Sequence, residues 1–320
     1  MSPVLQFRRK AQSLKNRLSP ACVVLCYHRV SDETGDYWGN AISLKNFEDH
    51  VALVSERYRV LSIGQLVESV GRGKPPARRS IVITFDDGYA VNTEGACRSL
   101  SNHRAPAAFY LNTGWLTGDR FWWDELTDAM PDEECARTVA QLLPAEAALS
   151  VGSGVQRREL IAIVRNAFKA MRDDHRREVL RSMRHPTSMA ARPDSAPMRI
   201  SDIAAIARDP LFTIAGHTHT HPALSLLPPD RQRAEIQENK RILEHLTGQP
   251  IRHFSYPFGG PDDFDDSTIA ELRLAGYLSA VTTLRRPVRW PCDVFRIPRL
   301  SVKNWDVRKF QKELDGAWSN

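Results

Sequence analysis

The stretch IVITFDDGY, from Ile81 to Tyr89, has the pattern that decides the fold. Its first five residues are apolar or β-branched, which is typical of a buried strand. Two adjacent carboxylates, Asp86 and Asp87, follow at the C-terminal end of that strand, and Gly88 allows the chain to turn there. Because active sites of α/β folds gather at the carboxyl edge of the sheet, the stretch predicts a strand that delivers acidic side chains to a site.

Other short apolar runs predict further buried strands. They lie at Val23–Tyr27, Ala107–Leu111, Phe212–Ala215, His253–Tyr256, Leu278–Val281 and Phe295–Ile297. Helical patterns lie between these runs. The clearest helix begins with Asp230 as its N-cap and ends before Gly248, and another runs from about 267 to 276. Strands that alternate with helices favour an α/β fold with a parallel sheet, either open or closed into a barrel.

One region breaks this alternation. From about 121 to 210 the strand signal is weak and the helix signal is strong, which predicts a helical insertion over one end of the sheet. We therefore expect a basic N-terminal segment at 1–20, a single domain at 21–310 that contains the insertion, and a C-terminal tail at 311–320.

Composition limits the class of protein. The chain has 320 residues, of which 42% are hydrophobic, and a formal net charge of +6, as in a globular protein with a large core. Basic residues are spread along the chain without zinc-finger spacing or an aromatic-basic motif, so we expect no nucleic-acid partner. The five scattered cysteines do not indicate a disulfide framework. No apolar run approaches the roughly 18 residues of a membrane span or forms a signal-peptide core, so we expect a cytoplasmic protein.

The N-terminal segment 1–20 has two interpretations. Leucines alternate in it with a set of basic residues, namely Arg8, Arg9, Lys10, Lys15 and Arg17. Such a segment would form a basic amphipathic helix that contacts anionic lipid at the inner membrane. A solvated tail is an equal alternative, because the leucines fit a helical stripe poorly.

A second cluster of functional side chains follows the predicted strand that ends at Ala215. The run GHTHTHP, from Gly216 to Pro222, contains three of the ten histidines. If the segment coils, His217 and His221 share a face, whereas in an extended segment His219 would share it as well. A single histidine is usually structural, but a cluster at a strand end opposite an aspartate pair favours metal ligation.

Two histidines and one aspartate would make a three-ligand site with open positions for water and substrate. Such a site suits a hydrolytic metal, and a second carboxylate nearby would take a proton from the water. Two other runs indicate functional residues less strongly. His28 ends the first predicted strand, and Gly259 and Gly260 follow another strand and would permit close approach of a ligand to the backbone.

Together these runs resemble the polysaccharide deacetylases of carbohydrate esterase family 4, which have the NodB-like catalytic domain. TFDDG, at 84–88, resembles the first motif of that family, and HTHTHP, at 217–222, resembles the second. The resemblance spans about Val23 to Val302, and the two motifs in this order are a specific signal. It implies an α/β fold in the form of a distorted (β/α) barrel of the polysaccharide deacetylase type, with a helical insertion.

The resemblance also implies roles for individual residues. Asp87, His217 and His221 would be the metal ligands, with zinc as the expected ion and cobalt, nickel or manganese as alternatives. Asp86 would be the general base that takes a proton from the attacking water. The backbone N–H of Phe258 would donate to the oxyanion. His219 becomes a spacer between the two ligands.

Two departures from the family pattern indicate a particular branch. The third-motif arginine that braces the catalytic aspartate in many members is Ser255 here, and the late histidine that serves as general acid has no counterpart, because no histidine follows His253. An early Tyr-His pair, which ends at His28, resembles the branch associated with bacterial exopolysaccharide synthesis. On that resemblance His28 is the candidate general acid. Arg296 or Arg299 would then brace a carboxylate.

Three residues are expected to contact the substrate, namely Tyr256, Trp123 and Arg296. Trp123 belongs to the run FWWD at 121–124, which is similar to a run in the same branch. Its ring would stack on a sugar face, or alternatively pack inside the insertion.

The predicted function is the metal-dependent removal of N-acetyl groups from an amino-sugar-containing saccharide. We expect a bacterial cell-surface or exopolysaccharide precursor, in lipid-linked form if the N-terminal segment contacts the membrane. Three alternatives are an enzyme of the same fold that acts on an O-acetyl ester or a non-sugar amide, a catalytically weakened saccharide-binding protein, and a non-haem iron oxygenase. The second carboxylate beside the ligand set favours hydrolysis over oxygenation.

Overall fold

The computed structural model describes residues 21–32, 39–75, 79–116, 118, 120–129, 157–182 and 193–319. The N-terminal segment 1–20, and with it the expected contact with lipid, lies outside these residues. Within the described part of the chain, no helix has both the length and the apolar character needed to span a membrane.

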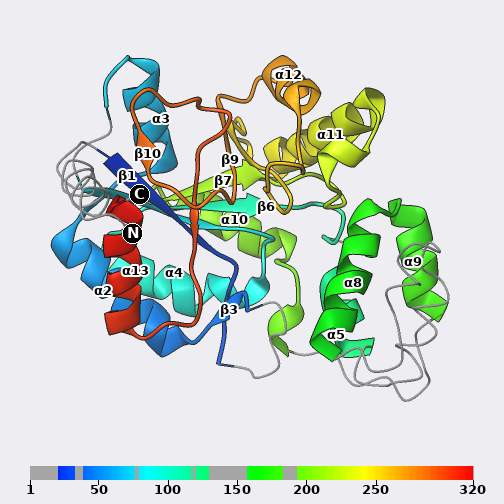
Figure 1. The fold of residues 1–320 in the computed structure, drawn as a ribbon, viewed down its shortest axis with the longest axis horizontal. Helices are drawn as coiled ribbons and strands as arrows, with labels where there is room; N and C mark the ends of the chain where they lie inside the picture. Colours follow the sequence, from blue (N-terminus) through cyan, green and yellow to red (C-terminus); the bar gives the residue numbers. More distant parts are fainter. Residues whose placement is uncertain are drawn as a thin grey trace, which may run out of the picture.

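A mainly parallel sheet forms the centre of the molecule (Figure 1). Among the described residues it has nine strands, and its main path follows the order β10-β1-β5-β6-β7-β8-β9. The bounds along this path are β1 Ala21–Tyr27, β5 Ser80–Phe85, β6 Ala107–Leu111, β7 Phe212–Gly216, β8 His253–Ser255, β9 Ser279–Val281 and β10 Val288–Arg289. Each pairing along the path is parallel except that of β10 with β1. The expected parallel α/β sheet is therefore confirmed.

Burial on both faces explains why the strands have continuous apolar runs. Every residue of β1 (ACVVLCY) and of β5 (SIVITF) is buried. A parallel sheet covered on both faces has no solvent side, so the alternation of apolar and polar residues is lost. The prediction of a last strand at Phe295–Ile297 was wrong, because in that run only Ile297 makes a strand-type bridge, and it is an isolated one.

The segment 297–302 connects the β9 end of the sheet back to β1. Ile297 bridges Val281 at the end of β9, and β11 (Leu300–Ser301) then pairs in parallel with β1. Arg299 lies in this closing segment and is fully buried. Three shorter strands complete the set: β2 Arg29–Val30, β3 Ala41–Ile42 and β4 Arg59–Val60. Because the main strands run parallel, their carboxyl ends lie together at one end of the barrel.

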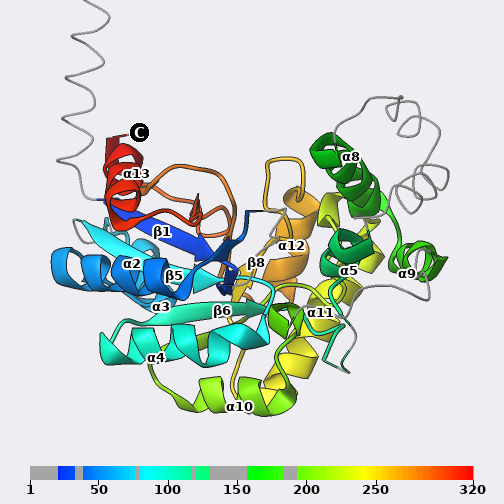
Figure 2. The same cartoon turned by 90° about the horizontal axis from the view of Figure 1, so that it is seen from below.

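Helices surround the sheet (Figure 2). Those of the barrel are α2 Leu44–Arg57, α3 Ile63–Gly71, α4 Gly95–Asn102, α10 Ile200–Arg208, α11 Pro229–Thr247, α12 Asp266–Leu274 and α13 Val307–Ser319. Short 3₁₀ turns lie at η1 Ala90–Thr93, η2 Pro193–Ser195 and η3 Leu224–Leu226. The N-cap of α11 is Pro228 rather than Asp230, which lies in the first turn, where a carboxylate is favoured by the helix dipole.

The helical insertion forms its own layer beside the barrel (Figures 1 and 2). Its described helices are α5 Trp122–Ala129, α8 Arg157–Ala170 and α9 Asp173–Ser182. They share an apolar cluster that is separate from the main core and includes Leu126, Val164 and Val179. α10 belongs to the barrel instead, because Ile203 and Ile206 lie in the main core. The expected end of the insertion at about 210 was therefore too late.

Residues 311–319 are not a tail. They belong to α13, and Phe310, Leu314 and Trp318 are buried in the main core. The ring of His50 stacks on Phe310, with 3.7 Å between the ring centroids. The expected tail was wrong, because the i, i+4, i+8 spacing of these apolar residues is that of a helix packed on the core.

We expect Leu314→Ala to lower the free energy of unfolding by about 2–5 kcal/mol, because the substitution leaves a cavity in the core. Denaturant unfolding followed by circular dichroism measures this change. Lys312→Ala, on the exposed face of α13, is the matched control and should stay within about 0.5 kcal/mol of the wild type. An equally small effect for both variants would show that α13 does not stabilise the core.

Candidate active site

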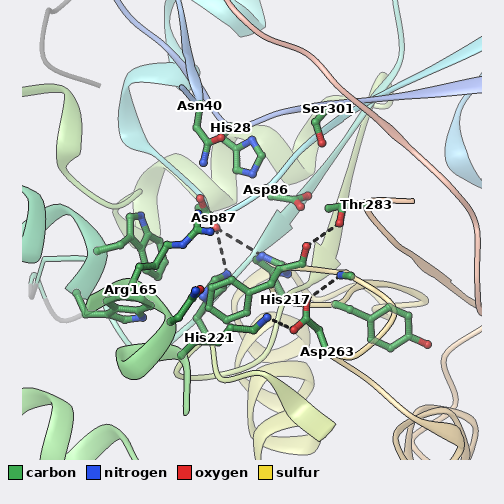
Figure 3. Close-up of a pocket in the computed structure, with 17 residues that line it drawn as sticks. His28, Asn40, Asp86, Asp87, Arg165, His217, His221, Asp263, Thr283 and Ser301 are labelled. Atoms are coloured by element: carbon green, nitrogen blue, oxygen red, sulfur yellow. Dashed lines mark hydrogen bonds and ion pairs between the residues drawn. The ribbon is translucent and has the colours of Figure 1, made fainter. Parts of the chain in front are cut away.

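A cavity of about 350 Å³ opens at the carboxyl end of the sheet (Figure 3). The barrel residues that line it include His28, Asp86, Asp87, His217 and His221. Residues of α5 and α8 line it as well, so the insertion forms one wall of the site. The side chains singled out in the two sequence motifs are thus brought together.

A tight turn directs both carboxylates into this cavity. The N–H of Asp86 donates to the carbonyl of Tyr27 at 3.0 Å, so Asp86 still belongs to the strand ladder. Asp87 has a φ of 73°, and the N–H of Gly88 donates back to the carbonyl of Asp86 at 3.0 Å. A left-handed backbone at a non-glycine residue is uncommon and is typical of functional sites. The turn brings together two side chains that would diverge on a straight strand.

Helix α11 fixes the histidine loop. Asn239 on this helix is fully buried, and its Oδ1 accepts from the N–H of His217 at 3.2 Å. Glu235, one turn earlier, accepts from the backbone N–H groups of His219 and Thr220 at 2.9 and 2.7 Å. These bonds satisfy the backbone of an irregular loop, which would otherwise be costly to bury. The loop is therefore held in one conformation.

Asp87, His217 and His221 form a set that fits a divalent cation. The Nε2 atoms of the two histidines lie 3.5 and 3.6 Å from the same Asp87 Oδ1. Neighbouring ligands of a tetrahedral zinc ion are about 3.4 Å apart, given bond lengths of about 2.1 Å. His217 Nδ1 lies 2.7 Å from the carbonyl of Ser255, which places the proton on Nδ1 and leaves the Nε2 lone pair for a metal.

The electrostatics of the two histidines agree with ligation. Burial, together with the neighbouring His217, lowers the pKa of His221 to about 3, so its ring is neutral. Burial alone would also lower the pKa of His217, but the hydrogen bond with Asp87 raises it above its usual value. A cation bound between His217 and Asp87 would compete with a proton for the same position.

Asp86 is held by Arg299 instead. The two terminal nitrogens of Arg299 donate to the two carboxylate oxygens at 2.7 and 2.6 Å, in the bidentate geometry that is strongest for this pair. Ser255 Oγ donates to Asp86 at 3.1 Å and accepts from Arg299 at 2.9 Å. Burial alone would raise the pKa of Asp86, but Arg299 and His217 hold that pKa well below its usual range. Asp86 is therefore ionised.

Arg299, and not Arg296, is the residue that braces this carboxylate. It supplies from the closing segment the guanidinium that Ser255 cannot provide. Arg296 is half-exposed and pairs with Asp266 and Asp293 outside the cavity lining. Arg296 is therefore not part of the cavity lining, and its contact with a substrate stays a prediction.

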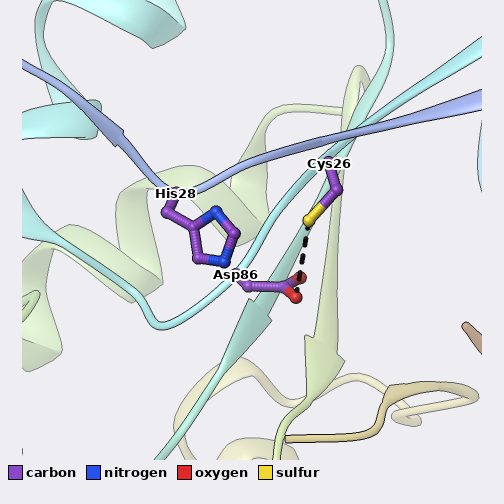
Figure 4. Close-up of side chains that lie close together, drawn as sticks. All are labelled: Cys26, His28 and Asp86. Atoms are coloured by element: carbon purple, nitrogen blue, oxygen red, sulfur yellow. Dashed lines mark hydrogen bonds between the residues drawn. The ribbon is translucent and has the colours of Figure 1, made fainter. Parts of the chain in front are cut away.

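His28 stands beside Asp86 (Figure 4). Nitrogen, sulfur and oxygen atoms of His28, Cys26 and Asp86 lie within 4.8 Å of one another. Burial raises the pKa of the Cys26 thiol, so it is a neutral group 3.7 Å from Asp86 Oδ2. Because Arg299 already binds both oxygens of Asp86, this group is poorly suited to a cation. Burial also lowers the pKa of His28, against the pull of the two carboxylates.

The loop after β8 presents a backbone donor. Phe258 has a φ of 62°, and the N–H of Gly259 donates to the carbonyl of Pro257 at 2.7 Å, which repeats the tight turn at Asp87. Among the described residues the N–H of Phe258 has no hydrogen-bond partner. A backbone donor held in this way beside the ligand set is suited to stabilise developing negative charge.

Trp123 and Tyr256 both line the cavity. The ring of Trp123 lies 4.5 Å from that of His221, and its Nε1 donates to the hydroxyl of Tyr89 at 2.7 Å. Tyr256 is fully buried, and its hydroxyl donates to the carbonyl of Phe295 at 2.9 Å. Trp123 is buried in the apolar cluster of the insertion and stacks on Phe121, so its ring is used largely within the protein, as is the hydroxyl of Tyr256.

Three residues that shape the site lie outside the sequence motifs, namely Asn239, Glu235 and Lys169. Asn239 has a signal, because it is a polar residue in the apolar stripe of α11 between Ile236 and Leu243. Glu235 and Lys169 have none, since their contacts join elements that are distant in sequence.

Comparisons with known proteins are consistent with this site. A sequence model described as polysaccharide deacetylase matches residues 73–140 and 178–280, which is more than half of the chain. A poly-β-1,6-N-acetyl-D-glucosamine N-deacetylase of Escherichia coli (strain K12) is 34% identical over 68 residues. The match covers 21% of this chain and 10% of the relative, so the chain aligns with about a tenth of that protein.

Solved structures share the fold. The Streptococcus pyogenes deacetylase PplD, in complex with acetate, superposes with a TM-score of 0.61 and 15% identity, over 92% of this chain and 97% of that one. IcaB from Ammonifex degensii gives a TM-score of 0.58 and 18% identity, over 94% and 98%. The expected distorted (β/α) barrel of the polysaccharide deacetylase type is confirmed.

We expect the protein to bind Zn²⁺ or Co²⁺, and His217→Ala or His221→Ala to weaken the affinity by about 100-fold or more, because each removes a ligand. Isothermal titration calorimetry measures the affinity. His219→Ala is the matched control, because the ring of His219 contacts Thr113 rather than the ligand set. A loss of equal size in His219→Ala would show that the ligands are wrongly assigned.

Proposed function

Because the chain belongs to the polysaccharide deacetylase family, we propose that it removes N-acetyl groups from an amino-sugar-containing saccharide with the help of a divalent metal ion. One observation carries this proposal. Three ligand atoms, from Asp87, His217 and His221, converge beside a second carboxylate that is ionised and held apart from them. This is the arrangement that hydrolysis of an acyl group requires.

Zinc is the proposed ion, with cobalt, nickel or manganese as alternatives, and Asp87, His217 and His221 would hold it. When bound, such an ion polarises a carbonyl oxygen and lowers the pKa of water. The donor set agrees with this choice, since two imidazoles and one carboxylate suit these metals better than calcium or magnesium.

The protein groups would move the protons. Asp86 takes a proton from the attacking water, and Arg299 keeps its carboxylate in place. The N–H of Phe258 donates to the acetyl oxygen as that oxygen becomes negative. His28 protonates the leaving nitrogen as the C–N bond breaks, so that acetate and a free amine result. Because burial lowers the pKa of His28, we infer that its proton comes from Asp86 during the reaction.

The proposed substrate is a glycan that contains N-acetylglucosamine, such as a bacterial exopolysaccharide or cell-surface precursor. The Escherichia coli relative is named for its action on poly-β-1,6-N-acetyl-D-glucosamine, which supports this class. The absence of an arginine at Ser255 does not favour the alternative of a weakened saccharide-binding protein, because Arg299 braces Asp86 instead.

We expect the zinc-loaded or cobalt-loaded protein to release acetate from β-1,4-linked and β-1,6-linked N-acetylglucosamine oligomers and to expose free amines. Asp86→Asn should lower kcat by about 10²–10⁴-fold, because it removes the base, and should retain metal affinity. A coupled acetate assay and amine labelling measure the two products. No turnover across the panel would contradict the proposed function, and near-normal turnover by Asp86→Asn would contradict the role of Asp86.

We expect His28→Ala to slow hydrolysis of the amide much more than hydrolysis of 4-nitrophenyl acetate, because nitrophenolate leaves without a proton. The ratio of the two kcat/KM values measures this selectivity. His103→Ala, at an exposed histidine, serves as the control. Equal slowing of both substrates by His28→Ala would exclude His28 as the general acid.

A further inference from the structure

We propose that Lys169, on the insertion helix α8, is a positioning residue for the loop that presents the Phe258 N–H. In this way the insertion takes part in catalysis by the barrel. The inference rests on the proposed function, since it gives that N–H its role at the acetyl oxygen.

One carboxylate connects α8 to the loop (Figure 3). Lys169 Nζ forms an ion pair with Asp263 Oδ1, and the other oxygen of Asp263 accepts from the backbone N–H of Gly260 at 2.8 Å. The side chain of Asp263 is 6% exposed and that of Lys169 is 27% exposed, so the pair is largely shielded from water. A buried carboxylate that lost this lysine would be left uncompensated, which is strongly destabilising for its surroundings.

Lys169 also contacts the other end of the same loop. Its Nζ lies 4.8 Å from the centre of the Phe258 ring, within the range of a cation–π interaction. That ring in turn lies 5.0 Å from the ring of His221. Lys169 therefore holds the loop at Phe258 and at Asp263, on the side that faces the cavity.

The conformation of the loop explains why it needs this support. Phe258 has a φ of 62°, and a left-handed backbone at a non-glycine residue persists only when its surroundings hold it. The barrel holds one side, because Thr283 donates through its hydroxyl to the carbonyl of Phe258 at 2.8 Å and through its N–H to the carbonyl of Gly259 at 2.9 Å. The insertion adds a second hold on the same loop, because Lys169 contacts the Phe258 ring and pairs with Asp263, which accepts from the Gly260 N–H.

This role differs from that of a proton donor. A negative oxygen develops during hydrolysis of an amide and of an activated ester alike, so displacement of the Phe258 N–H slows both reactions. A purely structural bond between insertion and barrel would lower stability without lowering kcat. A substrate contact in the ground state would raise KM instead.

The experiment compares Lys169→Met, Lys169→Arg and the control Arg172→Met in the metal-loaded protein. Arg172 lies just beyond α8, is exposed and pairs with Asp174, away from the loop. We expect Lys169→Met to lower kcat by about 10–100-fold on both the N-acetyl saccharide and 4-nitrophenyl acetate, with KM and metal affinity changed less than about twofold. Lys169→Arg should recover most of the rate, because it retains the charge, and Arg172→Met should behave as the wild type.

Hydrogen exchange of peptides that span residues 256–264 provides a readout that does not depend on turnover. Exchange should be faster in Lys169→Met and unchanged in Arg172→Met. Normal exchange and normal kcat in Lys169→Met, an effect on KM alone, or slowing confined to the amide would each overturn the inference. A wild-type protein without turnover would contradict the proposed function instead, and the exchange data would still decide whether Lys169 holds the loop.

Discussion

The pairing of Arg299 with Asp86 is the interaction on which the site depends. Asp86 and Asp87 are adjacent, and only 3% and 6% of their surfaces are exposed. Two such carboxylates cannot both remain charged unless each has its own compensation. Arg299 satisfies both oxygens of Asp86, which leaves Asp87 to face His217 and His221. The arginine thereby keeps one carboxylate away from the ligand set and available as a base.

The segment that closes the barrel also supplies Arg299 to the site. Residues 297–302 bridge β9 to β1, and Arg299 enters the interior from the middle of this bridge. Its Nε donates to the carbonyl of Thr282 at 2.9 Å, so the side chain is fixed by the strand end that it helps to join. An arginine in the third motif and an arginine in this closing segment can thus bind the same carboxylate. The position of the guanidinium decides this, and not the place of the arginine in the sequence.

The sequence was sufficient for the features that depend on local pattern. The buried runs at 81–85 and 107–111 predicted their strands, and the spacing of His217 and His221 predicted a shared face. Features that depend on tertiary contact were not accessible in this way. Arg296 and Arg299 lie in an irregular segment without periodicity, so nothing in the sequence showed which of them turns inward. The helix signal of α10 likewise did not show which core it joins, and that is why the insertion boundary was misplaced.

Anomalous diffraction from crystals of the zinc-loaded protein tests the separation of the two carboxylates most directly. We predict one strong peak about 2.0–2.2 Å from Asp87 Oδ1 and from the Nε2 atoms of His217 and His221, with Asp86 still paired to both terminal nitrogens of Arg299. A peak bonded to Asp86, with Arg299 displaced from its carboxylate, would contradict the account.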